Sequence, residues 1–280
     1  MGLSEELAIV SLVGTDAKAC LALSDEAGWN QTEEDWRLFI EKGRTFGIRD
    51  GQANLIATAA AFPYEGNFGF VSMVLVTSAR RREGLATRLV DLCVDHIQAQ
   101  RLVPVLDATP AGEAVYAKQG FRSLFSIERW QGESRGGSAA SDIRNYAPSD
   151  LASIIALDAE ALGARRGAIL AGFLDRAGSR AFVSPGGRGF ALIRAGRKAL
   201  QLGPIVAGSV AEALKLLGSV LAAVRGTFFI DVPMRQREIG EMLARRGFTR
   251  QRSFSRMAHG HGTAFGRPEN LFAVAGPEFG

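Results

Sequence analysis

A turn rich in basic and small residues, Arg81–Ala86, carries the groups best suited to chemistry in this chain. It follows an apolar run at Phe68–Thr77 and opens a helical pattern at Leu85–Gln100. The free N–H groups at the start of a helix carry partial positive charge and bind phosphate groups. Gly84 and Ala86 let the backbone come close to such an anion. The pattern therefore predicts a pyrophosphate site.

Two other interpretations of this turn are weaker. An arginine triplet is by itself more often a solvated turn, but the adjoining Gly84 and Ala86 at a helix start favour phosphate binding. A Walker-type nucleotide loop is disfavoured because no Gly-Lys-Ser or Gly-Lys-Thr follows. In a phosphate site, Arg81 and Arg82 would each add about 0.3–1 kcal/mol when exposed.

The elements that must hold this turn alternate between strand and helix periodicity. The predicted strands are Glu6–Val13, Phe46–Arg49, Leu55–Pro63, Phe68–Thr77, Val103–Ala108 and Ser123–Trp130. The predicted helices are Asp16–Ala27 with Asp16 as N-cap, one that starts at Thr32–Asp35, Leu85–Gln100 and Gly112–Gln119. This alternation indicates an α/β (α+β) fold.

A stretch rich in Gly and Ser, Gln131–Asp142, divides the chain. Beyond it, Asp150–Asp158 echoes Asp16–Ser24, and Leu243–Phe248 echoes Tyr116–Phe121, at nearly constant separation. A length of 280 residues also suits two domains of ordinary size. We therefore predict an N-terminal domain at 1–131, a linker at 132–142 and a C-terminal domain at 143–280.

Composition excludes several classes of protein. The net charge of +4 is mild, and the sequence lacks the clustered basic and aromatic residues of a nucleic-acid site. No apolar run approaches the length that spans a bilayer, and the first residues are acidic where a signal peptide is basic. Cys20 and Cys93 lie in amphipathic helical patterns and indicate free thiols in a reducing cytoplasm. His259-Gly260-His261 lacks a third ligand, so no metal site is expected.

The first half resembles the GNAT superfamily of acyl-CoA-dependent N-acetyltransferases. Arg81–Ala86 matches the Arg/Gln-x-x-Gly-x-Gly/Ala loop of that family, and Tyr116 with Gly120-Phe121 follows at the expected place. The resemblance implies a mixed, largely antiparallel twisted sheet flanked by helices, and coenzyme A binding. It implies that these residues contact acetyl-CoA: Val74, Leu75, Val76, Arg81, Arg82, Glu83, Gly84, Leu85, Ala86, Thr87, Thr109 and Tyr116.

The second half, from about Ile143, resembles the C-terminal GNAT-like domain of a two-domain bacterial subset of the family. The residues that carry this likeness are Leu202–Ala207, Asp231–Pro233, Gly247-Phe248, Arg256-Met257 and Phe272–Glu278. No pyrophosphate loop follows Leu202–Ala207, because Gly208–Glu212 brings an acid and no arginine. We expect this half to have lost coenzyme A binding and to form a wall of the acceptor site.

The resemblance assigns roles to particular side chains. The backbone of Val74–Val76 would pair with the pantetheine amides, as an added strand does. Tyr116 would protonate the departing thiolate as general acid. A lone tyrosine on a short helix is more often a packing residue, and only the match to the family motif favours the catalytic role. Thr109 stands where the family often has Asn, and its hydroxyl can still donate to coenzyme A.

The general base is less clear because Phe68–Thr77 contains no carboxylate. Asp107 at the end of the Val103–Ala108 strand is the leading candidate, and an N-cap role for it is equally well supported. A water relay or another carboxylate are the alternatives. Asp231 could contact the amine, although a structural aspartate at a strand end is the commoner case.

These features predict an acetyl-CoA-dependent N-acetyltransferase that acts on a primary amine of a small molecule by direct attack. The alternatives are a non-catalytic acyl-CoA-binding regulatory protein, favoured by the missing carboxylate, and a protein-lysine acetyltransferase. The expected partners are the amine and, as an open alternative, a second copy of the chain. Nucleic acid and membrane are not expected partners.

Overall fold

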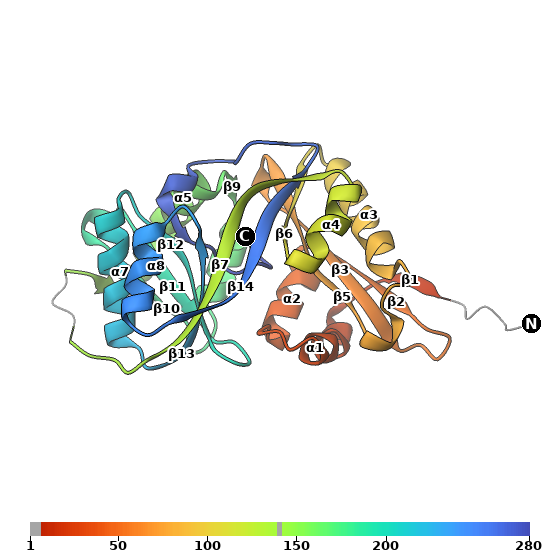
Figure 1. The fold of residues 1–280 in the computed structure, drawn as a ribbon, viewed down its shortest axis with the longest axis horizontal. Coiled ribbons are helices and arrows are strands. Elements are labelled where there is room, and N and C mark those ends of the chain that lie inside the picture. The colour runs from red at the N-terminus through yellow and green to blue at the C-terminus, as the bar shows by residue number, and fades with distance from the viewer. Residues whose placement is uncertain (1–6, 139–141) are drawn as a thin grey trace, which may run out of the picture.

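The computed structural model describes residues 7–138 and 142–280. Within them, one continuous 13-stranded sheet runs through both halves of the chain in the order β1-β2-β3-β5-β6-β14-β7-β13-β12-β11-β10-β8, with β15 paired to β12. Figure 1 shows α3 and α4 beside the strands of the first half, and α7 and α8 beside those of the second half. The pairings are mostly antiparallel, and β5–β6 and β12–β13 are parallel.

The first half supplies the following elements. Its strands are β1 (Ala8–Ser11), β2 (Arg44–Arg49), β3 (Leu55–Pro63), β4 (Glu65–Gly66), β5 (Phe68–Val76), β6 (Val103–Ala108) and β7 (Phe121–Ser134). Its helices are α1 (Ala17–Glu26), α2 (Glu33–Lys42), α3 (Leu85–Gln98) and α4 (Pro110–Lys118).

The second half repeats this plan. Its strands are β8 (Arg144–Asn145), β9 (Ala164–Arg165), β10 (Arg180–Val183), β11 (Phe190–Arg194), β12 (Leu200–Val206), β13 (Gly226–Pro233), β14 (Thr249–His259) and β15 (Leu271–Ala273). Its helices are α5 (Leu151–Leu162), α6 (Gly167–Leu174), α7 (Val210–Ala223) and α8 (Arg237–Arg245).

The two halves exchange their long strands. β14 of the second half lies between β6 and β7, where Met257 is opposite Leu106. β7 of the first half lies between β14 and β13, where Arg129 is opposite Asp231. Each long strand therefore hydrogen-bonds to strands of both halves, and the chain folds as one sheet.

In the first half, β5 and β6 pair only at one end. Their parallel pairing runs from Phe68 opposite Val103 to Phe70 opposite Val105. Beyond it, β5 carries a bulge opposite β3, and Met73 in the bulge has a left-handed φ of 55°. The two strands therefore separate toward the start of α3, which leaves one edge of the Val74–Val76 backbone without β6 beside it.

The matching gap in the second half is filled by the chain itself. β12 and β13 pair in parallel only over Leu200–Leu202, and beyond that point β15 pairs with β12 in antiparallel fashion. Gly203 makes this close approach possible, because a Cβ there would overlap the carbonyl oxygen of Val274. The segment after β15 then turns into the middle of the molecule, where Figure 1 marks the C-terminus.

The hydrophobic core also crosses between the halves. Phe279 stacks on Phe39 of α2 with ring centroids 4.6 Å apart and meets Phe173 of α6 edge-on at 4.9 Å. Aromatic rings at such distances contribute beyond their buried area. The C-terminal segment thus packs into a core built from helices of both halves.

The sequence predicted most elements well. β3 and β6 have the predicted bounds, and Thr32 caps α2 by accepting a hydrogen bond from the Asp35 N–H. Asp16 sits at the start of α1, but its carboxylate accepts from the Val13 N–H and not from the helix. β7 runs through Ser134, three residues into the predicted linker, of which residues 139–141 lie outside the described residues, as do residues 1–6. No helix in the described ranges is long and apolar enough to cross a membrane.

Candidate active site

The predicted anion loop is open and has the backbone conformation that such a site needs. Gly84 is the N-cap of α3 with φ of 76°, and a Cβ built on it would meet no atom within 4 Å. Arg81 and Arg82 are exposed beside it, while Glu83 is held by the Arg80 guanidinium at 2.9 Å. Leu85 is buried in the core, and Ala86 and Thr87 are half-buried in the first turn of α3. The loop therefore presents backbone N–H groups to solvent.

Glu26 of α1 fixes the approach to this loop. Its carboxylate accepts hydrogen bonds from the Ser78 N–H at 2.6 Å and from the Thr77 hydroxyl at 2.9 Å. These bonds lower the pKa of Glu26 below its usual value, the Ser78 contact being the largest cause. The end of β5 and the loop are thus held in place by an ionised side chain.

A cavity of about 130 Å³ opens where β5 and β6 separate. This volume is well beyond the roughly 10–15 Å³ that one water needs. The first half supplies Trp29, Asn30, Gln31, Val71, Ser72, Met73, Val74, Leu106, Asp107, Thr109, Tyr116 and Arg129, and the second half supplies Arg252, Phe254, Pro277 and Glu278. Predicted residues Val74, Thr109, Tyr116 and Asp107 are therefore brought together at one cavity, whereas Leu75 and Val76 lie farther along β5, opposite Thr58 and Ala57.

Tyr116 is half-buried on α4 against Phe121, with ring centroids 6.1 Å apart. Burial raises the pKa of its phenol to about 12, and nearby Cys93 adds a smaller effect. Its hydroxyl forms no hydrogen bond to any residue that the structure describes. The phenol is therefore protonated at neutral pH and available to a molecule in the cavity.

The N-cap role considered for Asp107 is wrong, because Thr109 caps α4. The Thr109 hydroxyl oxygen accepts from the Gly112 N–H at 3.3 Å, which leaves its proton free to be donated. Both carboxylate oxygens of Asp107 are held instead by Arg256 of β14, at 2.7 and 2.8 Å. Burial raises the pKa of Asp107 and the Arg256 guanidinium opposes that change. Asp107 thus joins β6 to β14 through a buried ion pair.

Four buried polar atoms at the cavity have no hydrogen-bond partner among the described residues. They are Gln31 Oε1, Ser72 Oγ, Arg252 Nε and Glu278 Oε2. Buried polar atoms are normally paired, and each exception needs an explanation. Their convergence on one cavity indicates a site whose hydrogen bonds are completed by a ligand.

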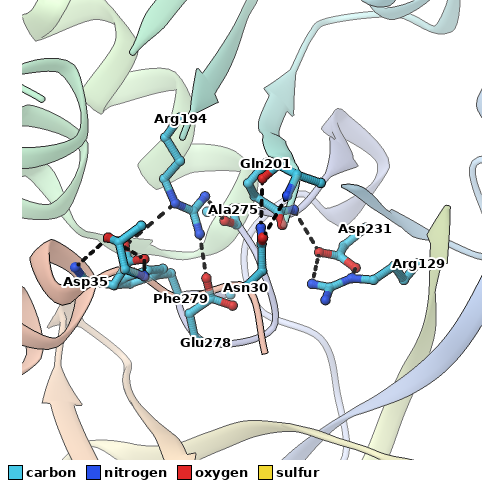
Figure 2. A network of polar contacts seen from close by, with 12 residues as sticks. Asn30, Asp35, Arg129, Arg194, Gln201, Asp231, Ala275, Glu278 and Phe279 are labelled. Atoms are coloured by element: carbon cyan, nitrogen blue, oxygen red, sulfur yellow. Dashed lines mark hydrogen bonds and ion pairs between the residues drawn. The ribbon is translucent and has the colours of Figure 1, made fainter. Parts of the chain in front are cut away.

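Glu278 is the carboxylate with a free oxygen, and it comes from the C-terminal segment. Its Oε1 accepts a hydrogen bond from Arg194 of β11, which also donates to the Ala275 carbonyl and lies 3.8 Å from Asp35 (Figure 2). Its Oε2 has no partner in the described part of the chain. Burial raises the pKa of Glu278 above its usual value, and Arg194 opposes the rise.

Arg129 faces the same cavity from β7. Its Nε and Nη2 donate to the two oxygens of Asp231 at 2.8 Å each, and Gln201 donates to Asp231 at 2.9 Å (Figure 2). Asp231 is fully buried in this network, which agrees with the structural role considered for it. The Nη1 group of Arg129 has no hydrogen-bond partner within residues 7–138 and 142–280.

Three side chains at the cavity, Arg129, Arg252 and Glu278, were not among the residues predicted from the sequence to form the site. Glu278 lies in Phe272–Glu278, a segment already marked by the resemblance, so a signal for it existed. Arg129 and Arg252 gave no such signal, because only the exchange of β7 and β14 brings them to the cavity. His259 and His261 contact Gln98 and Phe265 respectively, and no metal-binding cluster was found within the described residues.

The place in the second half that corresponds to the anion loop is occupied by a side chain. Glu212 in the first turn of α7 accepts from the Gly208 N–H at 3.1 Å and from the Ser184 hydroxyl at 2.5 Å. Ser209 caps the same helix by accepting from the Glu212 N–H. The Glu212 carboxylate thus accepts the Gly208 N–H where a phosphate would otherwise bind, while β15 fills the gap between strands.

Comparison with known proteins gives two domain matches. The acetyltransferase (GNAT) family model matches residues 15–121, and a second acetyltransferase (GNAT) domain model matches residues 154–273. An uncharacterized N-acetyltransferase, YitH, from Bacillus subtilis is 24% identical over 249 residues, which cover 86% of this chain and 87% of the relative.

Solved structures share the whole arrangement. A protein from Pyrococcus horikoshii described as an acetyltransferase superposes with a TM-score of 0.82 at 18% identity, covering 100% of this chain and 98% of that one. A tandem GNAT protein from the clavulanic acid biosynthesis pathway gives a TM-score of 0.64 at 16% identity, covering 90% and 98%. At these identities the likeness concerns the fold. The two domain matches, which together cover most of the chain, show that this chain belongs to the GNAT superfamily of acetyltransferases and carries two GNAT domains in tandem.

Proposed function

We propose that the protein transfers an acetyl group from acetyl-CoA to the primary amine of a small molecule. One observation carries the proposal: Tyr116 and Glu278, whose Oε2 has no hydrogen-bond partner among the described residues, line the same cavity beside the separated strands β5 and β6. A phenol that can give a proton and a carboxylate that can take one are the two groups that amide formation from a thioester needs.

The residues of the first half fit coenzyme A. Gly84 leaves open space at the start of α3 for a pyrophosphate, with Arg81 and Arg82 exposed beside it. β5 separates from β6 after Phe70, so the backbone of Val74–Val76 can pair with the pantetheine amides. Acetyl-CoA supplies the activated acyl group when bound, and the loop and strand orient its thioester toward Tyr116.

We propose Glu278 as the general base in place of Asp107, because Arg256 occupies both oxygens of Asp107. Glu278 would accept a proton from the amine as the nitrogen bonds to the thioester carbonyl carbon. Tyr116 would give its proton to the sulfur as the C–S bond breaks. Burial raises the pKa of Tyr116 to about 12, so the phenol keeps its proton at neutral pH until a thiolate forms beside it.

A small acceptor is favoured over a protein lysine. Both halves line the cavity, with Trp29 and Gln31 from the first half and Phe254 and Pro277 from the second half. A site lined by side chains of both halves suits a small acceptor better than an extended peptide, which needs an open groove. The regulatory alternative is a protein that binds acyl-CoA without turnover. The measurement of thiol release described next distinguishes it from an enzyme.

The test measures coenzyme A thiol release with a panel of primary amines. The wild-type protein is expected to release thiol only when an amine is present, and Tyr116→Phe is expected to lower turnover by about 10²–10⁴-fold with unchanged coenzyme A affinity by calorimetry. Tyr146→Phe, a half-buried tyrosine of the second half, serves as the matched control and should keep wild-type rates. Coenzyme A binding without thiol release for any amine would support the regulatory alternative and refute the proposal.

A further inference from the structure

We propose that the acceptor is an amino acid, whose amine lies at Glu278 and whose carboxylate is held by Arg252 and Arg129. This inference rests on the proposed function and adds the chemical class of the acceptor. It depends on the charges that face the cavity, on the register of β7 and β14, and on the free N–H groups of the two arginines.

Among the described residues, one cation that lines the cavity forms no ion pair with a carboxylate. Asp107 is paired with Arg256, Arg129 with Asp231, and Glu278 with Arg194. Arg252 lines the cavity, and no carboxylate of the described residues forms an ion pair with it. A partly buried guanidinium without an anion is costly, so a ligand with a negative group would remove that cost.

The strand register places two arginines directly opposite each other. Arg252 of β14 faces Arg129 of β7 in the antiparallel pairing, and a bulge between Arg250 and Arg252 sets this alignment. Like charges at directly opposed positions destabilise a sheet. Burial, the larger cause, and the charge of Arg129 both lower the pKa of Arg252, and the charge of Asp231 opposes them. An anion between the two side chains would convert this repulsion into attraction.

The free N–H groups of the pair suit a carboxylate. Arg252 Nε is buried and has no hydrogen-bond partner in the described part of the chain, and Nη1 of Arg129 is not engaged by Asp231. Phe254 fixes both guanidinium groups, whose Cζ atoms lie 5.4 Å (Arg129) and 5.6 Å (Arg252) from the centre of its ring. Planar guanidinium groups held in this way match the two oxygens of a carboxylate.

The position of the amine follows from the acceptor atoms of other residues that line the cavity. Glu278 Oε2 is an unpartnered acceptor among the described residues, as are Gln31 Oε1 and Ser72 Oγ. An amine is a donor of hydrogen bonds, so it complements these oxygens and not the arginines. A neutral amine with a carboxylate carries one negative charge, which balances the unpaired charge of Arg252.

The experiment compares the common amino acids with the amines that lack only the carboxylate, for example phenylalanine with phenethylamine and leucine with isoamylamine. Thiol release is measured with acetyl-CoA and the wild-type protein. We expect at least one amino acid to exceed its matched amine at least tenfold in kcat/KM, and its methyl ester to behave like the amine. Equal rates within each pair, or a preference for the amines, would overturn the inference while leaving the proposed function intact. No thiol release with any compound would refute the proposed function itself.

A variant pair tests the assignment to Arg252. In Arg252→Met, the KM for the amino acid is expected to rise at least tenfold while the KM for acetyl-CoA stays near wild type, and the preference over the matched amine falls toward one. Arg250→Met is the control, because Arg250 lies on the same strand, is exposed and pairs with Glu128. An Arg252→Met protein that melts like wild type and keeps the full preference would contradict the role of Arg252. If that variant does not fold, the wild-type comparison still decides.

Discussion

At the scale of single residues, Glu278 differs from the other carboxylates of the site in having one oxygen without a partner in the described chain. Arg194 holds its other oxygen, and burial raises its pKa. A general base must be ionised to accept a proton, so a raised pKa means that Glu278 becomes active only at higher pH. Once ionised, a carboxylate with a raised pKa is also a stronger base. Asp107, whose two oxygens contact Arg256, lacks this freedom.

The pH dependence of turnover should report Glu278. With rates expressed per neutral amine, kcat/KM is expected to rise with pH through an apparent pKa above the ordinary glutamate value of 4.5. Glu278→Gln should lose this rise and turn over about 10²–10⁴-fold more slowly. Glu269→Gln, an exposed glutamate nearby in sequence, is the control. A Glu278→Gln protein that keeps the rise would contradict the assignment.

The same raised pKa has a consequence for stability. The folded protein holds the Glu278 proton more tightly than the unfolded chain does, so the free energy of unfolding is larger below pH 4.5 and falls as pH rises through the folded pKa. Glu278→Gln should remove this part of the decline, which denaturant unfolding at several pH values measures.

The sequence alone was enough to predict those site residues whose surroundings are formed by residues close to them in the chain. Gly84 is predictable because a left-handed N-cap and a helix start are encoded within a few residues, and Thr109 and Tyr116 follow the same short motif. Arg129 and Arg252 could not be predicted, because their proximity depends on which strands pair and in which register. The alternation of apolar and polar residues in a strand indicates which face is buried, but it does not indicate which strand lies beside it.

At the scale of elements, the C-terminal segment fills the gap that a cofactor strand would fill in the second half. β15 pairs with β12 beyond the point where β12 leaves β13, and Val274 donates its N–H to the Asp231 carbonyl at 2.9 Å. This placement carries Glu278 to the cavity of the first half. The segment that fills the gap between β12 and β13 in the second domain thus places Glu278 at the cavity of the first domain.

Gly203→Ala tests this arrangement. The new Cβ would overlap the Val274 carbonyl oxygen, so the C-terminal segment must move. We expect a loss of about 1–3 kcal/mol in the free energy of unfolding, by denaturant titration, together with lower turnover as Glu278 is displaced. Gly262→Ala is the matched control, because a Cβ there meets nothing within 4 Å. Unchanged stability and turnover in Gly203→Ala would show that the segment does not hold Glu278.

Most elements were predictable because their apolar patterns are strong, as in β3 and β6. The long strand β7 was predicted too short, since its last residues gain their order from pairing with β13 of the other half. β15 was not predicted at all. Its three residues are a strand because β12 offers an unpaired edge, which is a property of the tertiary fold.

At the scale of the whole molecule, strand exchange joins two GNAT domains into one sheet, and the aromatic core around Phe279 takes rings from α2 and α6. A domain that shares strands and core with its neighbour cannot unfold without exposing both. The first half alone would also leave β6 without β14 beside it.

Calorimetry should therefore record one unfolding transition for the full chain, with calorimetric and van't Hoff enthalpies nearly equal. Phe173 lies in α6 of the second half. The substitution Phe173→Ala should move the whole transition to lower temperature and reduce the free energy of unfolding by about 3–5 kcal/mol. Val115→Ala on the exposed face of α4 should leave it unchanged. Two separate transitions, of which Phe173→Ala shifts only one, would contradict a shared fold.

The most direct test of the central claim is a calorimetric titration of coenzyme A into the wild-type protein and Gly84→Glu. The substitution puts a carboxylate into the open space before α3, where the proposed diphosphate lies. Gly178→Glu is the matched control, because Gly178 has a similar positive φ of 80° and equally open surroundings. We predict that Gly84→Glu weakens coenzyme A binding at least tenfold, whereas Gly178→Glu binds as wild type. Equal affinity in all three proteins would contradict the claim that this loop holds coenzyme A.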